Sequence, residues 1–185
     1  MTASAGEETM QLLYEGLRQI AESTKQEGSS AERGWNLGAR WQARIAGTEC
    51  EFCAWDAHTS ASYPVEVARL RVSRWYLGAN QYVQGYSVLV LDRHAIELYD
   101  LSVDVRQAFT EDIADAARAL DEILKPIKMN IELQGNVIPH LHCHLKPRFA
   151  YDRPAHARIF QDAQLKEIPM TELEGFAVSL RAVIR

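Results

Sequence analysis

The chain has 185 residues, of which 47% are hydrophobic and 24% charged, and its formal net charge at pH 7 is −5. These values are ordinary for a globular protein with one well-packed core. The negative net charge argues against binding of DNA or RNA through the phosphate backbone, although a nucleotide can bind through local donors. We see neither a signal-peptide pattern nor an apolar run that could cross a membrane, and we expect a cytoplasmic protein.

The predicted elements begin with a helical arm at residues 1–40, followed by one domain at residues 41–185. Apolar residues three or four apart predict an amphipathic helix in the arm: Met10, Leu13, Leu17 and Ile20. Glycine and serine at residues 28–30 interrupt this pattern. The segment is therefore expected to be an added arm rather than a domain with its own core.

Four segments have the patterns of β-strands. Residues 65–72 alternate apolar with polar side chains, as a half-buried strand does, and residues 86–91 form a nearly continuous apolar run. Two more strands are predicted at residues 127–133 and 139–146. Pro147 is expected to end the last of them.

Two helices are predicted in the second half of the chain. The first begins after Ser102, a favourable N-cap, and ends before Pro126. Its expected buried stripe consists of Val105, Phe109, Ile113, Ala117, Leu120 and Leu124. The last helix is expected from Thr171, with Leu173, Phe176, Leu180 and Val183 on one face. Strands around one long helix, without regular strand–helix alternation, predict an α+β fold with an antiparallel sheet.

The most informative segment is residues 135–145, Gly-Asn-Val-Ile-Pro-His-Leu-His-Cys-His-Leu. On a strand, its three alternating histidines, His140, His142 and His144, would share one face. Because three of the six histidines of the chain fall here, a chance surface cluster is the weakest interpretation. A metal-binding His-x-His pair is an alternative, although no carboxylate follows at a spacing typical of a ligand.

This segment resembles the signature of the histidine-triad family, in which three histidines alternate with hydrophobic residues. Gly135-Asn136 stands where Gly-Gln is commoner in the family, and Pro147-Arg148 matches the Pro-Arg that often follows the triad. Upstream, residues 88–102 resemble the family's central strand, its following histidine and its helix start. The resemblance implies a histidine-triad-like α+β fold and a homodimer that extends one sheet across its interface.

The resemblance also implies an activity: hydrolysis of a nucleotide's phosphoanhydride or phosphoramide bond through a covalent nucleotidyl-histidine intermediate. His142 matches the nucleophile, and a neutral imidazole is a competent one at physiological pH. His144 is placed to donate to the leaving group or to a non-bridging oxygen. His140 completes the triad, and Asn136 matches the amide that contacts the phosphate. The expected substrate is a purine nucleotide or a dinucleoside polyphosphate.

Three further residues are candidates for substrate binding. Asn130 is a candidate polar contact to the substrate, or alternatively a turn residue. Arg148 would steer an outer phosphate, or else be an ordinary surface arginine. Asn80 lies near the position where the family carries its ribose-binding Asn or Asp.

The chain has three cysteines, Cys50, Cys53 and Cys143. This number argues against a disulfide framework, and the Cys-x-x-Cys pair suggests metal or redox chemistry. Some triad proteins bind zinc through such a pair, a histidine after the central strand and the first triad histidine. Here these positions are Cys50, Cys53, His94 and His140. Two thiolates and two imidazoles suit a closed, structural Zn²⁺ site. The thioredoxin-like alternative is weaker, because no strand–Cys-x-x-Cys–helix pattern is present.

Three other functions remain open from the sequence. One is a nucleotidyltransferase or phosphorylase of the same superfamily, which uses the same covalent intermediate with an acceptor other than water. Another is a purine-nucleotide-binding regulator with low turnover. A zinc-dependent scaffold without affinity for nucleotides is the third.

Overall fold

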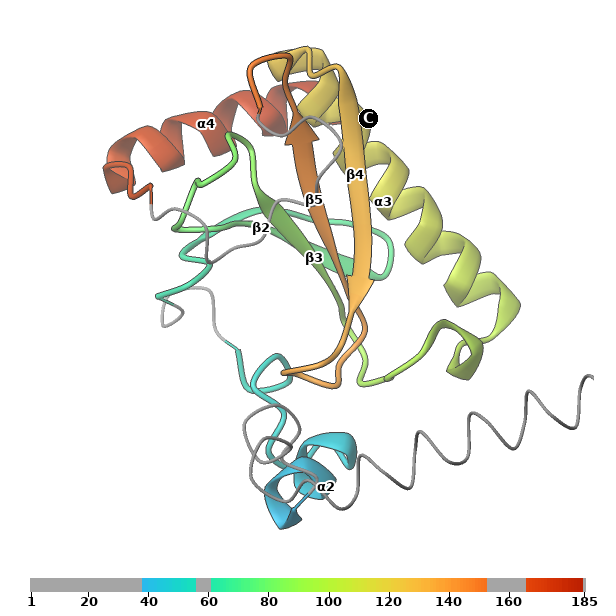
Figure 1. The fold of residues 1–185 in the computed structure, drawn as a ribbon. Helices are drawn as coiled ribbons and strands as arrows, with labels where there is room; N and C mark the ends of the chain where they lie inside the picture. Colours follow the sequence, from blue (N-terminus) through green and yellow to red (C-terminus); the bar gives the residue numbers. More distant parts are fainter. Residues whose placement is uncertain (1–37, 56–60, 153–165, 185) are drawn as a thin grey trace, which may run out of the picture. The chain divides into compact units, whose positions relative to one another are not determined.

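The computed structural model describes residues 38–55, 61–152 and 166–184 (Figure 1). The chain divides into two compact units, Met1–Gln42 and Ala43–Arg185. Most of the predicted arm at residues 1–40 lies outside the described residues, so the arm and its boundary stay predictions. The second unit contains every candidate site residue.

The second unit is built on a five-stranded sheet with strand order β1-β2-β3-β5-β4. Its strands are β1 (Val65–Arg69), β2 (Ser73–Leu77), β3 (Ser87–Leu91), β4 (Lys128–Gln134) and β5 (His142–Arg148). The helices are α2 (Ala39–Ile45), η2 (Leu98–Asp100), α3 (Val103–Leu124) and α4 (Met170–Val183). Every strand pairing is antiparallel, which confirms the predicted α+β fold. No helix in the described ranges is both long and apolar enough to cross a bilayer.

The strand boundaries differ from the prediction in three places. The last strand begins at His142, and not at residue 139. The predicted strand at residues 65–72 ends at Arg69, and β2, which follows a tight turn, was not predicted. Four of the five β2 side chains are buried, so this strand lacks the alternation that marks a half-exposed one. Pro147 does not end the last strand. It lies inside β5 opposite Met129, beyond the last β5 residue paired with β3, where its missing amide proton breaks no bond to β3.

The long helix α3 begins as the sequence predicts, because the Ser102 hydroxyl accepts a hydrogen bond from the Val105 amide at 3.4 Å. Its predicted apolar stripe is buried or packed against the core. The buried Asp112 was not predicted as part of this stripe. Its carboxylate accepts hydrogen bonds from the Val72 amide and the Ser73 hydroxyl, which ties the helix to the β1–β2 turn.

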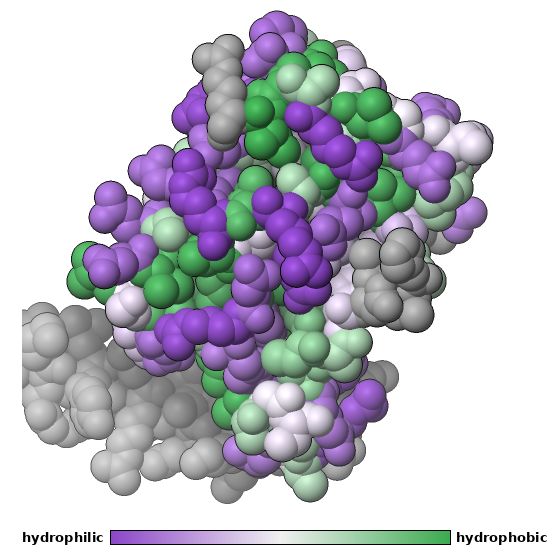
Figure 2. Space-filling view, turned by 180° about the vertical axis from the view of Figure 1, so that it is seen from behind, coloured by the Kyte–Doolittle hydropathy of each residue, from purple (hydrophilic) through white to green (hydrophobic). Residues whose placement is uncertain are grey.

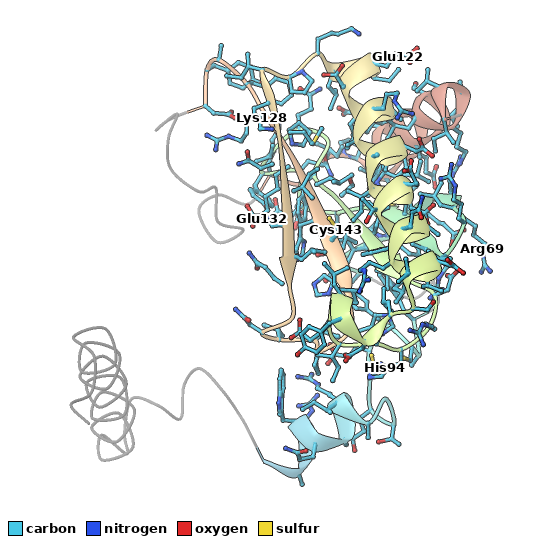
Figure 3. All side chains as sticks on the ribbon, turned by 90° about the vertical axis from the view of Figure 1, so that its right-hand side faces the viewer. Arg69, His94, Glu122, Lys128, Glu132 and Cys143 are labelled. Carbon is cyan, nitrogen blue, oxygen red and sulfur yellow. The ribbon has the colours of Figure 1, made fainter. Side chains whose placement is uncertain are left out.

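The two faces of the sheet have different roles. The helices α3 and α4 pack on one face, where the main core includes Leu89, Cys143 and Leu145 (Figure 1). Figure 3 shows Cys143 on the side of the sheet toward α3 and Glu132 on the side away from it. The opposite face carries a smaller cluster around Phe52 and Val88, and His144 stands in register with Val88. We call this side the histidine face.

Candidate active site and metal cluster

Cys50, Cys53, His94 and His140 form a compact cluster, in which the four potential ligand atoms lie within 4.8 Å of one another. The Cys50 sulfur is 3.4 Å from Nδ1 of His140, and the Cys53 sulfur is 3.3 Å from Nδ1 of His94. Tetrahedral Zn²⁺ bonded to sulfur at about 2.3 Å and to nitrogen at about 2.0 Å would separate such atoms by about 3.5 Å. The donor set and its spacing therefore fit a metal ion.

Backbone carbonyls fix the tautomers of both histidines in this cluster. Nε2 of His140 is 2.8 Å from the Leu91 oxygen, and Nε2 of His94 is 2.8 Å from the Ile45 oxygen. Because a carbonyl oxygen only accepts, each Nε2 carries the proton and each Nδ1 presents its lone pair to the thiols. Such outer hydrogen bonds are typical of metal-ligating histidines.

Desolvation favours the neutral form of two members of the cluster, the buried His140 and the exposed Cys53. It lowers the pKa of His140 to about 4 and is the largest cause of that shift. Burial, followed by the hydrogen bond to and the charge of Cys50, raises the pKa of Cys53 to about 11. A cation among these groups would reverse the effect on the thiol and favour its thiolate.

His142 is buried on the histidine face and holds a defined tautomer. Its Nδ1 lies 2.6 Å from the backbone oxygen of His140, so Nδ1 carries the proton and Nε2 has a free lone pair. Burial lowers the pKa of His142, and the hydrogen bond to His140 only partly opposes this. The Phe52 ring, from the loop that carries both cysteines, packs edge-on at 4.9 Å between ring centroids.

His144 lies next to His142, with 4.8 Å between the ring centroids. Its Nδ1 is 2.9 Å from the hydroxyl of Tyr86, and that hydroxyl is 2.9 Å from the hydroxyl of Tyr63. Burial lowers the pKa of His144 to about 3, and the charges of His142 and Lys146 add to this. Near neutral pH the ring is therefore uncharged.

The spacing of the triad departs from a simple strand row. His142 and His144 point to one face of β5 as predicted, but His140 precedes the strand. Its side chain contacts the cysteines of the cluster, while its backbone carbonyl accepts a hydrogen bond from Nδ1 of His142. His140 thus contacts His142 through its backbone carbonyl and not through its ring.

The edge strand β4 brings polar side chains to the histidine face. Gln134 pairs with His142 and Glu132 with His144 in the sheet register. Asn130 pairs with Lys146, inside the strand, so its interpretation as a turn residue is wrong. The Glu132 carboxylate accepts from Lys146 Nζ at 2.8 Å and from Gln134 Nε2 at 2.8 Å.

The remaining predicted residues lie in different settings. Asn136 is exposed in the loop between β4 and β5. Arg148 is 6% exposed and its Nε lies 3.0 Å from Asp152, so it is not a surface arginine. The Asn80 side-chain oxygen accepts from the amides of Tyr82 and Lys166, which gives it a structural task in that loop. Their roles in substrate binding stay predictions.

Sequence patterns did not identify the residues that surround His142 and His144. In the sequence, Tyr86 belongs only to an apolar run, and Tyr63 lies in a segment without a recognisable pattern. Phe52 carried a usable signal, because an aromatic residue inside a Cys-x-x-Cys pair is expected to pack near whatever the cysteines bind. Glu132 and Lys146 are separated by 14 positions and meet only through strand pairing.

Comparisons with solved structures identify the fold. A histidine-triad protein from Bradyrhizobium japonicum matches with a TM-score of 0.60 and 24% identity, over 82% of this chain and 99% of that one. One from Sinorhizobium meliloti matches with a TM-score of 0.61 and 20% identity, over 70% and 95%. A zinc-bound histidine-triad protein from Mycobacterium smegmatis matches with a TM-score of 0.54 and 21% identity, over 74% and 93%.

No family model matches the sequence, and a comparison with curated proteins gave no match. The structural matches therefore carry the assignment: the chain has the histidine-triad fold.

Proposed function

We propose that this protein is a histidine-triad hydrolase that cleaves a phosphoanhydride or phosphoramide bond of a nucleotide through a nucleotidyl-His142 intermediate. The observation that carries this proposal is the 2.6 Å contact between Nδ1 of His142 and the backbone oxygen of His140. It leaves Nε2 as an unprotonated nitrogen on a ring whose burial favours the neutral form. A neutral imidazole with a directed lone pair is a nucleophile at physiological pH.

The proposed reaction has two displacements. In the first, Nε2 of His142 bonds to the α-phosphorus, and the leaving group departs with the electron pair of its bond to phosphorus. The Nδ1 proton stays on the ring, where the His140 carbonyl stabilises the resulting positive charge. In the second, water bonds to phosphorus, the nitrogen–phosphorus bond breaks, and the water proton passes to solvent. The products are a nucleoside monophosphate and the leaving group.

His144 supports hydrolysis over transfer to another acceptor. By the family resemblance, branches that transfer the nucleotidyl group often carry Gln at this position. A neutral His144 can donate one hydrogen bond to charge developing on the leaving group or on a phosphate oxygen. Its ring lies 4.8 Å from that of His142, measured between centroids, which is close enough for both to contact one phosphate.

Zn²⁺ is the metal we propose for the cluster of Cys50, Cys53, His94 and His140. Four protein ligands would close the coordination shell, so the ion would have a structural role. The cysteine loop also carries Phe52, whose ring packs against both His140 and His142. A metal in the cluster would thus fix the surroundings of the nucleophile without contacting the substrate.

A purine nucleotide or dinucleoside polyphosphate is the proposed substrate. Asn130 lies on the histidine face beside Lys146 and can reach a ligand bound there. Arg148 follows on the same face of β5 and contributes positive charge, although Asp152 shares it. We assign a phosphate contact to Asn136 and a ribose contact to Asn80 from the family resemblance alone.

We further propose a homodimer that joins two sheets at β4. This strand is an edge of the sheet. Its apolar residues Ile131 and Leu133 are 50% and 42% exposed, and Ile127, just before the strand, is 68% exposed. Apolar patches between polar side chains also occur on the face seen from behind (Figure 2). Ile131→Lys should yield a monomer in light scattering, whereas the same change at exposed Val178 on α4 should leave a dimer. A monomeric wild-type protein would contradict the proposal.

A substrate panel tests the proposed activity. Purified protein is incubated with adenylated and guanylated phosphoramidates and with dinucleoside polyphosphates, and products are followed by chromatography. We expect release of the nucleoside monophosphate with incorporation of one oxygen from labelled water. Release that requires inorganic phosphate would indicate a phosphorylase. Tight binding of AMP without turnover of any substrate in the panel would indicate a purine-nucleotide-binding regulator.

A further inference from the structure

A line of three hydrogen-bonding side chains leads from the edge of the histidine face to His144. The hydroxyls of Tyr63 and Tyr86 are 2.9 Å apart, and the Tyr86 hydroxyl is 2.9 Å from Nδ1 of His144. Tyr86 is 1% exposed, and its ring lies nearly parallel to that of His144, at an angle of 10°. The contact is therefore partly shielded from solvent.

The backbone of Tyr86 is held in place from two directions. The buried Gln81 side chain donates to the Tyr86 carbonyl at 2.9 Å and accepts from the Gly85 amide at 2.8 Å. Gly85 has a φ of +83°, and a Cβ there would lie 2.4 Å from Leu124, so only glycine fits. The position of the Tyr86 hydroxyl is thus determined by the fold.

The acidity of these groups determines which of them donates and which accepts in each hydrogen bond. A phenol is a stronger acid than a neutral imidazole N–H, and an imidazole nitrogen is a better acceptor than a phenol oxygen. The Tyr86 hydroxyl therefore donates to Nδ1 of His144. Since its single proton is then used, its oxygen accepts from the hydroxyl of Tyr63.

We propose that Tyr86 is a positioning residue that holds neutral His144 in the tautomer protonated at Nε2. This inference rests on the proposed function, in which His144 donates to the leaving group or a phosphate oxygen. A neutral imidazole has one N–H, so the tautomer decides whether the nitrogen away from Tyr86 donates or accepts. Tyr63 orients Tyr86 in turn. Without Tyr86, His144 would divide between the two tautomers and the donor would be present only part of the time.

Nitrogen-15 NMR of the histidine side chains tests the tautomer directly and needs no substrate. Protonated and unprotonated ring nitrogens have well-separated shifts, and the His144 signals are assigned by their loss in His144→Gln. We expect wild-type His144 to be protonated at Nε2, and Tyr86→Phe to move its two nitrogen shifts toward each other. Tyr76→Phe removes a buried hydroxyl from another tyrosine on the same face and should leave them unchanged. A wild-type His144 protonated at Nδ1, or unaltered shifts in Tyr86→Phe, would overturn the proposal.

Kinetics then separates this inference from the activity itself. Tyr86→Phe should lower kcat about tenfold with little change in KM, as expected for loss of one interaction specific to the transition state. In a His144→Ala background the same change should have no further effect, because the group it positions is gone. Equal losses in both backgrounds would contradict the positioning role. If the wild type turns over no substrate, the proposed function fails, and the NMR result still decides the tautomer.

Discussion

The imidazole Nδ1 of His142 lies 2.6 Å from the backbone oxygen of His140, while the side chain of His140 faces Cys50 and Cys53. One residue therefore belongs to the metal cluster through its ring and to the nucleophile through its carbonyl. This arrangement requires that residue 140 precede the strand instead of joining it. Because of this double role, the conformation of the loop that carries Cys50 and Cys53 affects the orientation of the His142 ring.

His142→Gln should abolish turnover while preserving the fold. The change removes the nucleophilic nitrogen, and we expect a loss of at least about a thousandfold in kcat. Glutamine fills much of the space beneath Phe52, which His142 contacts edge-on, so it is preferable to alanine at this buried position. Steady-state kinetics and thermal melting by circular dichroism are the measurements. Near wild-type turnover in a folded variant would refute covalent catalysis at this residue.

The protein should bind about one zinc ion per chain, and the ion should depend on Cys53. Elemental analysis of protein purified without added metal is expected to give near-stoichiometric zinc, with little left in Cys53→Ser. Chelation should lower the melting temperature of the wild type. Cys143→Ala is the matched control, because this thiol lies in the helix-side core and its loss should leave the zinc content unchanged. Zinc-free protein with reduced thiols would contradict the prediction.

The pH dependence of stability should report the partly buried His144. Its pKa is lowered to about 3 in the folded chain, so the unfolded chain binds a proton first as the pH falls below about 6.5. The histidine therefore destabilises the fold progressively toward acid. Compared with His144→Gln, the wild type should lose about 1.4 kcal/mol more free energy of unfolding for each pH unit below about 6. The free energy of unfolding of both proteins is measured by denaturation at pH 7 and pH 5. An equal change in the two proteins would show that folding does not favour the neutral form of His144.

Gln134 at the end of β4 and Asn136 in the loop that follows both carry a side-chain amide, and their variants should differ. Asn136→Ala should lower kcat/KM about tenfold, as expected for loss of one hydrogen bond to a charged oxygen, and Asn136→Gln should remain active. Gln134→Ala is the companion variant, since Gln134 pairs with His142 but its amide bonds Glu132. If Gln134→Ala carries the larger loss, the phosphate contact belongs to Gln134 and the assignment of Asn136 is wrong.

Much of the architecture could be predicted from sequence because its signals are local. Ser102 and Pro126 bound α3 by capping and by steric exclusion, and alternation placed Cys143 opposite the histidines. The strand β2 was not predicted, because a strand that is buried on both faces lacks the alternation of apolar and polar residues. The prediction that Pro147 ends the last strand is wrong, because a strand tolerates proline at a position where no neighbouring strand needs its amide proton.

The candidate site was predicted only in part, for a similar reason. The four metal-cluster residues could be named from spacing and resemblance, and the structure brings them together. The contact of Tyr86 with His144 joins residues 58 positions apart, and no periodicity encodes it. The salt bridge of Lys146 with Glu132 likewise follows from the β4–β5 register. Such contacts require the three-dimensional fold.

Trapping the covalent intermediate is the most direct test of the central claim. Protein is mixed with an adenylated substrate, quenched within milliseconds to seconds under alkaline conditions that preserve phosphoramidate bonds, and examined by intact and peptide mass spectrometry. We predict a mass increase of one nucleotidyl group, located on His142 and absent from His142→Gln. Turnover by the wild type without any adduct, or an adduct on another residue, would contradict the account.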